Sequence, residues 1–93
     1  MEKAKLADYP VEILRVIANN PIEAISYHKP QMQLGDVVKN KSDDETLEAL
    51  RSLENVGVLG FDPKLKFSMF NRGGYQVDLD EARKLYASYF VTL

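Results

Sequence analysis

The side chains that most often carry out catalysis are sparse in this chain. Among its 93 residues there is no cysteine, and the single histidine is His28. A metal site built from thiolates or several histidines therefore cannot form within one chain, and a histidine-activated nucleophile has one candidate. Because His28 lies in a segment framed by prolines, with no serine nucleophile motif nearby, we expect it to be a surface or loop residue.

Paired carboxylates and a glycine pair are the other arrangements that could do chemistry. Asp43-Asp44 and the pair Asp78 and Asp80 stand where helices are expected to begin, so capping explains them better than acid–base catalysis. Gly73-Gly74 lacks the following helix with lysine and serine that a phosphate-binding loop needs. The sequence therefore predicts a protein that is not an enzyme and needs neither a cofactor nor a metal.

Composition predicts a single domain over residues 1-93. Apolar residues make up 45% and charged residues 28% of the chain, a balance typical of globular proteins. No stretch approaches the roughly 20 apolar residues of a membrane span, and the start does not resemble a signal peptide. With no cysteine, a cytoplasmic location is expected. The formal net charge of −2 does not by itself favour nucleic-acid binding.

The strongest local signal predicts a helix over residues 43–56. Ser42 and Glu45 have the spacing of a capping box, and Gly57 suits the positive φ at which helices often end. The expected buried face of this helix consists of leucines about one turn apart: Leu47, Leu50 and Leu53.

Three further helices are expected from apolar residues at helical spacing. They cover residues 10–18, residues 34–39 and a terminal segment that begins near Leu79, with Asp78 available as its cap. In the segment between the first two helices, residues 22–33, the apolar residues follow neither a helical nor a strand spacing. It could hold a short strand or an irregular turn of helix.

After Gly57 the apolar residues recur at every second position, a spacing typical of strands. Residues 65–70 and 75–79 are predicted to pair as a hairpin, because Asn71-Arg72-Gly73-Gly74 between them has the residue types of a tight turn. Residues 58–61 could add a third short strand.

This order of elements resembles that of winged helix-turn-helix domains. The resemblance covers roughly residues 9–90, and its most specific part is LGDVVKNK at residues 34–41 leading into TLEALRSLENVGVL at residues 46–59. These stretches are similar to the family's second helix, turn and recognition helix. The resemblance implies an α+β fold with a three-helix core, a β-hairpin wing and an added C-terminal helix.

The same resemblance implies a transcriptional regulator whose partner is double-stranded DNA. In the family the third helix enters the major groove while surrounding residues hold phosphates. Arg72 is the best single candidate, since an arginine beside two glycines at the tip of the wing could approach the minor groove. The full set of expected DNA-binding residues is Lys39, Lys41, Ser52, Asn55, Lys64, Lys66 and Arg72.

Acidic residues on the expected recognition helix oppose this function. Arg51 is the only basic residue between Asp43 and Asn55, where the acids are Asp43, Asp44, Glu45, Glu48 and Glu54. Part of this charge is explained by the favourable placement of carboxylates in a first helical turn. The alternative function is therefore a protein-interaction module whose acidic third helix meets a basic partner without binding DNA.

Aromatic residues near the end of the chain predict a homodimer. Tyr86, Tyr89 and Phe90 lie on adjoining turns of the terminal helix, and one face of this helix together with Phe70 is expected to exceed what a monomer can bury. A symmetric contact through this helix would place two copies of the domain side by side.

Overall fold

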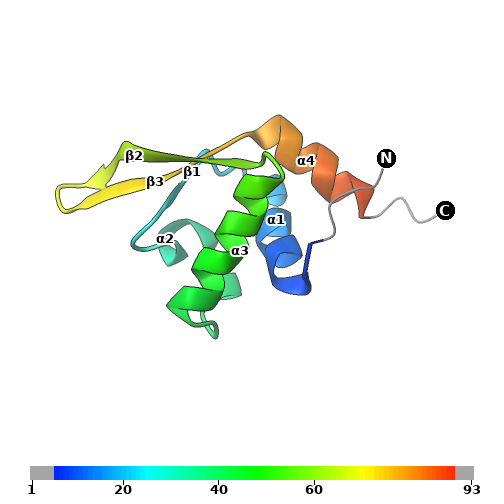
Figure 1. The fold of residues 1–93 in the computed structure, drawn as a ribbon, viewed down its shortest axis with the longest axis horizontal. Coiled ribbons are helices and arrows are strands. Elements are labelled where there is room, and N and C mark those ends of the chain that lie inside the picture. The colour runs from blue at the N-terminus through cyan, green and yellow to red at the C-terminus, as the bar shows by residue number, and fades with distance from the viewer. Residues whose placement is uncertain (1–5, 90–93) are drawn as a thin grey trace.

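Figure 1 shows the fold in a computed structural model, which describes residues 6–89. In chain order the elements are α1 (Asp8–Asn19), β1 (Ala24–Ser26), α2 (Gln31–Leu34), the 3-10 turn η1 (Gly35–Val38), α3 (Asp43–Asn55), β2 (Leu59–Ser68), β3 (Asn71–Val77) and α4 (Leu79–Ser88). α1, α2 and α3 lie on one side of an antiparallel sheet, α4 lies beyond one end of the sheet and packs on α1, and the β2–β3 hairpin projects at the other end. The expected α+β class is confirmed.

The core lies where α1, α3 and the sheet meet. Ile13, Leu14 and Ile17 of α1 are fully buried, because apolar residues three and four apart share one face of a helix. From α3 the buried residues are Thr46, Ala49, Leu50 and Leu53. Leu47, which the sequence placed on the buried face, is only half-buried. Thr46 takes the inner position instead, because its Oγ1 forms a 2.8 Å hydrogen bond with the hydroxyl of Tyr9 on α1.

The start of α3 is fixed by the capping box that the sequence predicted. The Glu45 backbone N–H donates to Ser42 Oγ at 3.1 Å, and Glu45 Oε1 accepts from the Ser42 backbone N–H at 3.2 Å. The helix ends at Asn55, and Gly57 follows with a φ of 88°. Both ends of α3 are therefore set by local chemistry.

The capping box should make stability depend on Glu45 ionisation. Hydrogen bonds from the Ser42 backbone N–H and then from its side chain hold the pKa of Glu45 below its ordinary value of 4.5. A carboxyl with a lowered folded-state pKa stabilises the fold above its unfolded pKa, and the effect is lost as pH falls through the folded value. Glu45→Gln keeps an acceptor but does not titrate, so the stability advantage of wild type over this variant should shrink on acidification.

Thermal unfolding between about pH 6 and pH 3 measures this difference. Ser42→Ala provides the companion variant, and it should lower the melting temperature by roughly 4–8 °C near neutral pH, because it removes the N-cap. A difference between wild type and Glu45→Gln that is constant over the whole pH range would contradict the assignment.

The sheet has the strand order β1-β3-β2, with both pairings antiparallel. β3 is therefore the central strand, with Tyr75 opposite Ile25 on one side and Phe61 on the other. The segment 22–33 contains β1 and most of α2, so it holds both structures that the sequence left open, a short strand and a turn of helix. The expected strand 58–61 exists too, but it is the first part of the long strand β2.

The hairpin turn is not where the sequence placed it. Ser68 pairs with Asn71, so the turn consists of Met69 and Phe70. Asn71-Arg72-Gly73-Gly74 belongs to β3, and the prediction that these residues form the turn was wrong. Arg72 consequently lies on a strand and not at the tip.

Both glycines have other roles in β3. Gly73 has a φ of 90° at the point where the register between Asp62 and Lys66 shifts, and a Cβ there would lie 3.9 Å from the Pro63 backbone. Gly74 leaves no space for a side chain, because a Cβ there would collide with the Ile25 carbonyl oxygen and the Phe67 ring. Gly73 thus permits a bulge, and Gly74 permits a close approach between strands. Because turns also favour glycine, the residue type alone does not distinguish these roles from a turn.

A buried polar pair joins the outer end of β3 to β1. Ser26 is 0% exposed, and its Oγ donates to Asn71 Oδ1 at 2.8 Å while accepting from the Lys29 backbone N–H at 3.1 Å. The Asn71 amide in turn donates to Met32 Sδ at 3.4 Å. These bonds fix the hairpin against the body of the protein.

Asn71→Ala should therefore destabilise the protein by about 1–3 kcal/mol, because it leaves the buried Ser26 hydroxyl without its acceptor. Urea unfolding followed by circular dichroism measures the change. Asn55→Ala is the matched control, since Asn55 is exposed and its removal should change stability by no more than about 0.5 kcal/mol. Equal effects of the two substitutions would contradict the structural role of Asn71.

Candidate nucleic-acid interface

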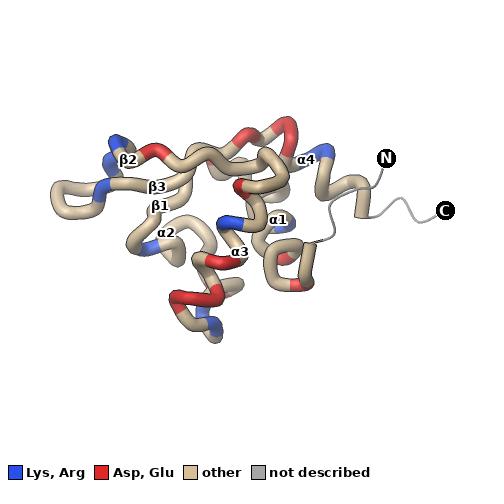
Figure 2. The backbone as a smooth tube through the Cα atoms, in the orientation of Figure 1, with Lys and Arg blue, Asp and Glu red and all other residues tan. Residues whose placement is uncertain are grey.

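The basic residues of the hairpin come together on its outer half. Lys64 and Lys66 lie on β2 and Arg72 on β3, all three are exposed, and Lys66 is directly opposite Arg72 in the strand register. Residues 63–77 contain no acidic residue. Figure 2 shows these basic positions on the part of the hairpin that projects from the helices.

The nearest acid along β2, Asp62, is already bonded. Its Oδ1 accepts from the Lys64 backbone N–H and its Oδ2 from the Gln76 amide, both at 2.9 Å. The one ion pair that the structure shows among residues 6–89 is on α4, between Lys84 and Glu81 at 3.8 Å. Lys66 and Arg72 therefore face each other across the strands without a carboxylate between them, an arrangement that is unfavourable for like charges.

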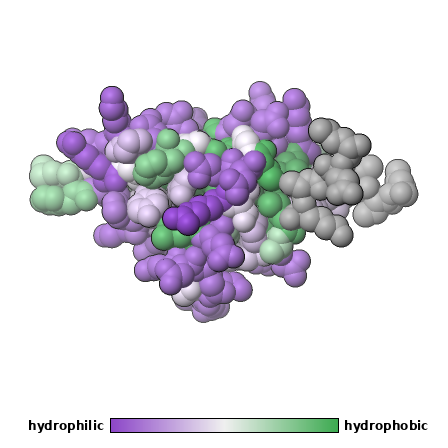
Figure 3. All heavy atoms as spheres, viewed as in Figure 1, coloured by the Kyte–Doolittle hydropathy of each residue, from purple (hydrophilic) through white to green (hydrophobic). Residues whose placement is uncertain are grey.

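The tip of the hairpin is apolar. The Phe70 side chain is 93% exposed and that of Met69 is 75% exposed. Figure 3 shows the hydrophobic colour at this end of the molecule, next to the hydrophilic surface of the hairpin. Phe70 was expected to exceed what a monomer can bury, but neither residue was predicted to lie at a tip.

Lys39 and Lys41 are exposed in the segment that joins η1 to α3. They line a surface hollow together with Asp36 and Asp43, so acids lie close to both. Lys41 Nζ also lies 5.1 Å from the centre of the Tyr9 ring, within the range of a cation–π contact. Lys41 therefore has an aromatic partner within the chain, whereas Lys39 only shares the hollow with these acids.

The remaining candidates on α3 differ in exposure. Asn55 is exposed near the end of the helix, whereas Ser52 is half-buried and its hydroxyl donates to the Glu48 carbonyl oxygen at 3.1 Å. Ser52 lines a hollow with Ala7 and Tyr9, on the side of α3 that faces the start of α1. Arg51, which is exposed, is the basic residue that the helix surface offers instead.

An aromatic group lies between the hairpin and the rest of the body. The Tyr27 ring is 5.6 Å from Phe61 and 5.3 Å from His28 between centroids, and Phe61 is 5.5 Å from Tyr75. Burial raises the pKa of the Tyr75 phenol, with a smaller contribution from the Glu54 carboxylate. His28 itself is exposed and outside any element, as the sequence predicted.

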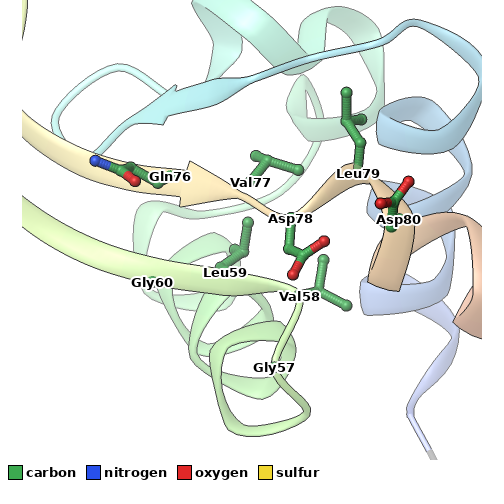
Figure 4. Close-up of a pocket in the computed structure, with 9 residues that line it drawn as sticks. All are labelled: Gly57, Val58, Leu59, Gly60, Gln76, Val77, Asp78, Leu79 and Asp80. Carbon is green, nitrogen blue, oxygen red and sulfur yellow. The ribbon is translucent and has the colours of Figure 1, made fainter.

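A surface hollow lies where the hairpin meets α4. It is lined by residues 57–60 and 76–80, and Figure 4 shows that the carboxylates of Asp78 and Asp80 are not turned toward each other. Asp78 Oδ1 accepts from the Glu81 backbone N–H at 3.1 Å, so it caps α4 as expected. Within residues 6–89 no group of three or more His, Cys, Asp or Glu residues is placed to hold a metal ion.

Two of the three aromatic residues expected at a dimer interface pack within the chain. Tyr86 and Tyr89 are half-buried against the core, and the Tyr89 hydroxyl accepts from the Leu6 backbone N–H at 3.3 Å. Phe90, the third expected interface residue, lies outside the described residues. The homodimer therefore stays a prediction.

The chain matches no protein-family model, and it shows no match to curated proteins or to solved structures. Among the described helices none has the length and apolar character needed to cross a membrane.

Proposed function

We propose that this chain is a winged helix-turn-helix domain that regulates transcription by binding double-stranded DNA, with the β2–β3 hairpin as its wing. The order α1, β1, α2, α3, β2, β3 supports this proposal, as does a hairpin that projects beside the capped third helix. β1 adds the small third strand against which such a hairpin is held.

The cross-strand pair Lys66 and Arg72 is the observation that carries the proposal. Two cations held opposite each other raise the energy of the free protein, and a polyanion lying along the hairpin would relieve their repulsion. Duplex DNA presents phosphates on both sides of each groove, so it can meet a cation from each strand of the hairpin. Lys64 extends the same basic surface toward the body.

The third helix has a smaller part in this binding mode. Its first turn, with Asp43, Asp44 and Glu45, repels phosphate, and Figure 2 shows this acidic segment at the end of α3 remote from the sheet. Arg51 and Asn55, which are exposed farther along the helix, are the residues able to approach base edges. DNA contact is thus concentrated on the wing, with Lys39 and Lys41 as secondary phosphate contacts.

The acidic first turn also favours the alternative function, a protein-interaction module with a basic partner. Glu48 adds a further exposed carboxylate to that surface. However, Glu45 belongs to the capping box, and acids at a helix N-terminus are stabilised by the helix dipole. The hairpin cations have no such structural explanation, and for this reason DNA binding is the stronger proposal.

Binding of a random-sequence duplex at two salt concentrations, about 50 and 200 mM, tests the proposal. Affinity should fall steeply with salt, because each neutralised phosphate releases counterions. Absence of binding at the lower concentration, together with capture of basic peptides by the acidic end of α3, would favour the interaction module.

The double variant Lys66→Ala/Arg72→Ala should weaken duplex binding and reduce the slope of log affinity against log salt by about 2, close to one per phosphate contact. Arg83→Ala/Lys84→Ala on α4 is the matched control, because it removes the same charge from exposed positions away from the hairpin. Fluorescence anisotropy of a labelled duplex gives both slopes. Equal losses in the two variants would indicate net charge and not a wing contact.

A further inference from the structure

We propose that Met69 and Phe70 form an apolar wedge that enters between neighbouring base pairs from the minor groove and kinks the DNA. This inference rests on the proposed function, because it assumes that the hairpin lies on a duplex. It goes beyond phosphate contact by assigning a role to the two residues at the tip.

The fold gives no reason for apolar residues at this tip. Neither Met69 nor Phe70 belongs to the buried core or to the residues packed against it. Neither has a positive φ, so the turn imposes no conformation that selects these residue types. Hairpin tips usually carry polar residues and glycine, and here the asparagine and glycines nearby serve β3 instead. The exposed pair is therefore available for a ligand.

The wedge is held on a fixed support. Immediately after the tip, Asn71 is 6% exposed and is bonded to Ser26 at the buried hydroxyl. The Tyr27 backbone N–H donates to the Gly73 carbonyl oxygen at 3.0 Å, and Phe67 packs over Gly74. Because the backbone next to the tip is already held in place, insertion costs little further backbone freedom, which favours binding.

The charges beside the wedge indicate that the ligand it enters is a nucleic acid. Lys66 precedes the tip on β2 and Arg72 follows it on β3, so cations stand on both strands behind the apolar residues. Side chains such as Phe and Met, inserted between base steps by proteins with basic minor-groove surfaces, unstack the step and bend the duplex. The acid-free stretch from residue 63 to 77 matches a polyanion better than it matches a neutral protein surface.

A lipid surface shares part of this chemistry, but two apolar residues bury little area in a bilayer. Among residues 6–89, Figure 1 shows no helix next to the tip that could strengthen such an anchor. Binding of anionic vesicles is therefore an outcome to be measured against duplex binding.

The wedge should prefer sequences that unstack readily. Pyrimidine–purine steps such as TA are the most easily kinked, so a duplex with a central TA step should be bent more than one with an A-tract at the same place. Specificity of this kind needs no hydrogen bond to a base. This preference for a DNA sequence would compensate for the acidic first turn of α3, which is poorly suited to hydrogen bonding with base edges.

The test uses the full chain and a duplex of about 30 base pairs, within the length over which such bends are measured, labelled at both ends for energy transfer. Wild type should shorten the end-to-end distance at saturation. Met69→Ser/Phe70→Ser should abolish this change while retaining the salt-dependent binding that Lys66 and Arg72 provide. Phe70→Leu should retain most of the bend, because leucine can also act as a wedge.

Folding of each variant is checked by its melting temperature, which should not change because both side chains lie in solvent. Affinity for an intact duplex should fall by less than about tenfold, since stacking with the wedge is offset by the cost of unstacking. A pre-kinked duplex with a central mismatch should show a larger ratio between wild type and the Ser variant.

Wild-type binding without bending would overturn the wedge and leave the proposed function intact. Absence of duplex binding would overturn the proposed function, and with it the wedge. Vesicles containing phosphatidylserine that bind wild type more tightly than duplex does, and lose binding with the Ser variant, would also overturn the wedge.

Discussion

The position of β3 between β1 and β2 is the constraint on which the rest of the structure depends. Because β3 pairs on both sides, its register determines where the core residues Ile25 and Tyr75 meet and where Lys66 faces Arg72. Its central position also explains why residue 74 is a glycine, since the Ile25 carbonyl oxygen and the Phe67 ring leave no space for a side chain there. A shift of one residue would turn every side chain of the strand to the opposite face.

The structure separates two surfaces that the net charge of the chain does not reveal. Acids gather at the first turn of α3, where the helix dipole and the capping box stabilise them. Cations gather on the hairpin, where no carboxylate between residues 63 and 77 balances them. A chain with a formal net charge of −2 therefore presents a positively charged surface on its hairpin. Local charge density, and not the total, governs which ligand approaches each surface.

Sequence reasoning succeeded where local chemistry alone determines the structure. Ser42 and Glu45 define the start of α3 through bonds within four residues, and Asp78 does the same for α4. It failed at the hairpin because Asn71 and the two glycines have the composition of a turn. Their actual roles come from Ser26 and Ile25, residues that are distant in the chain. The three-residue strand β1 was ambiguous for the same reason, since its stability comes from β3.

The candidate site was predictable as a set of basic residue types but not as an arrangement. Lys64, Lys66 and Arg72 were identified from charge alone, yet their pairing across strands requires the register. Ser52 illustrates the opposite case, because a residue expected on the outer face of α3 is half-buried against the start of α1. Met69 and Phe70 could have been found by asking which apolar residues had no neighbour in the core.

The bulge at Pro63 to Leu65 has a consequence for self-association. β2 is an edge strand, and an edge strand with free N–H and C=O groups invites pairing with another chain. Pro63 has no N–H to offer, the register shift bends the strand, and Lys64 and Lys66 would place like charges against a second copy. The features that present cations to a ligand therefore also protect the exposed edge from aggregation.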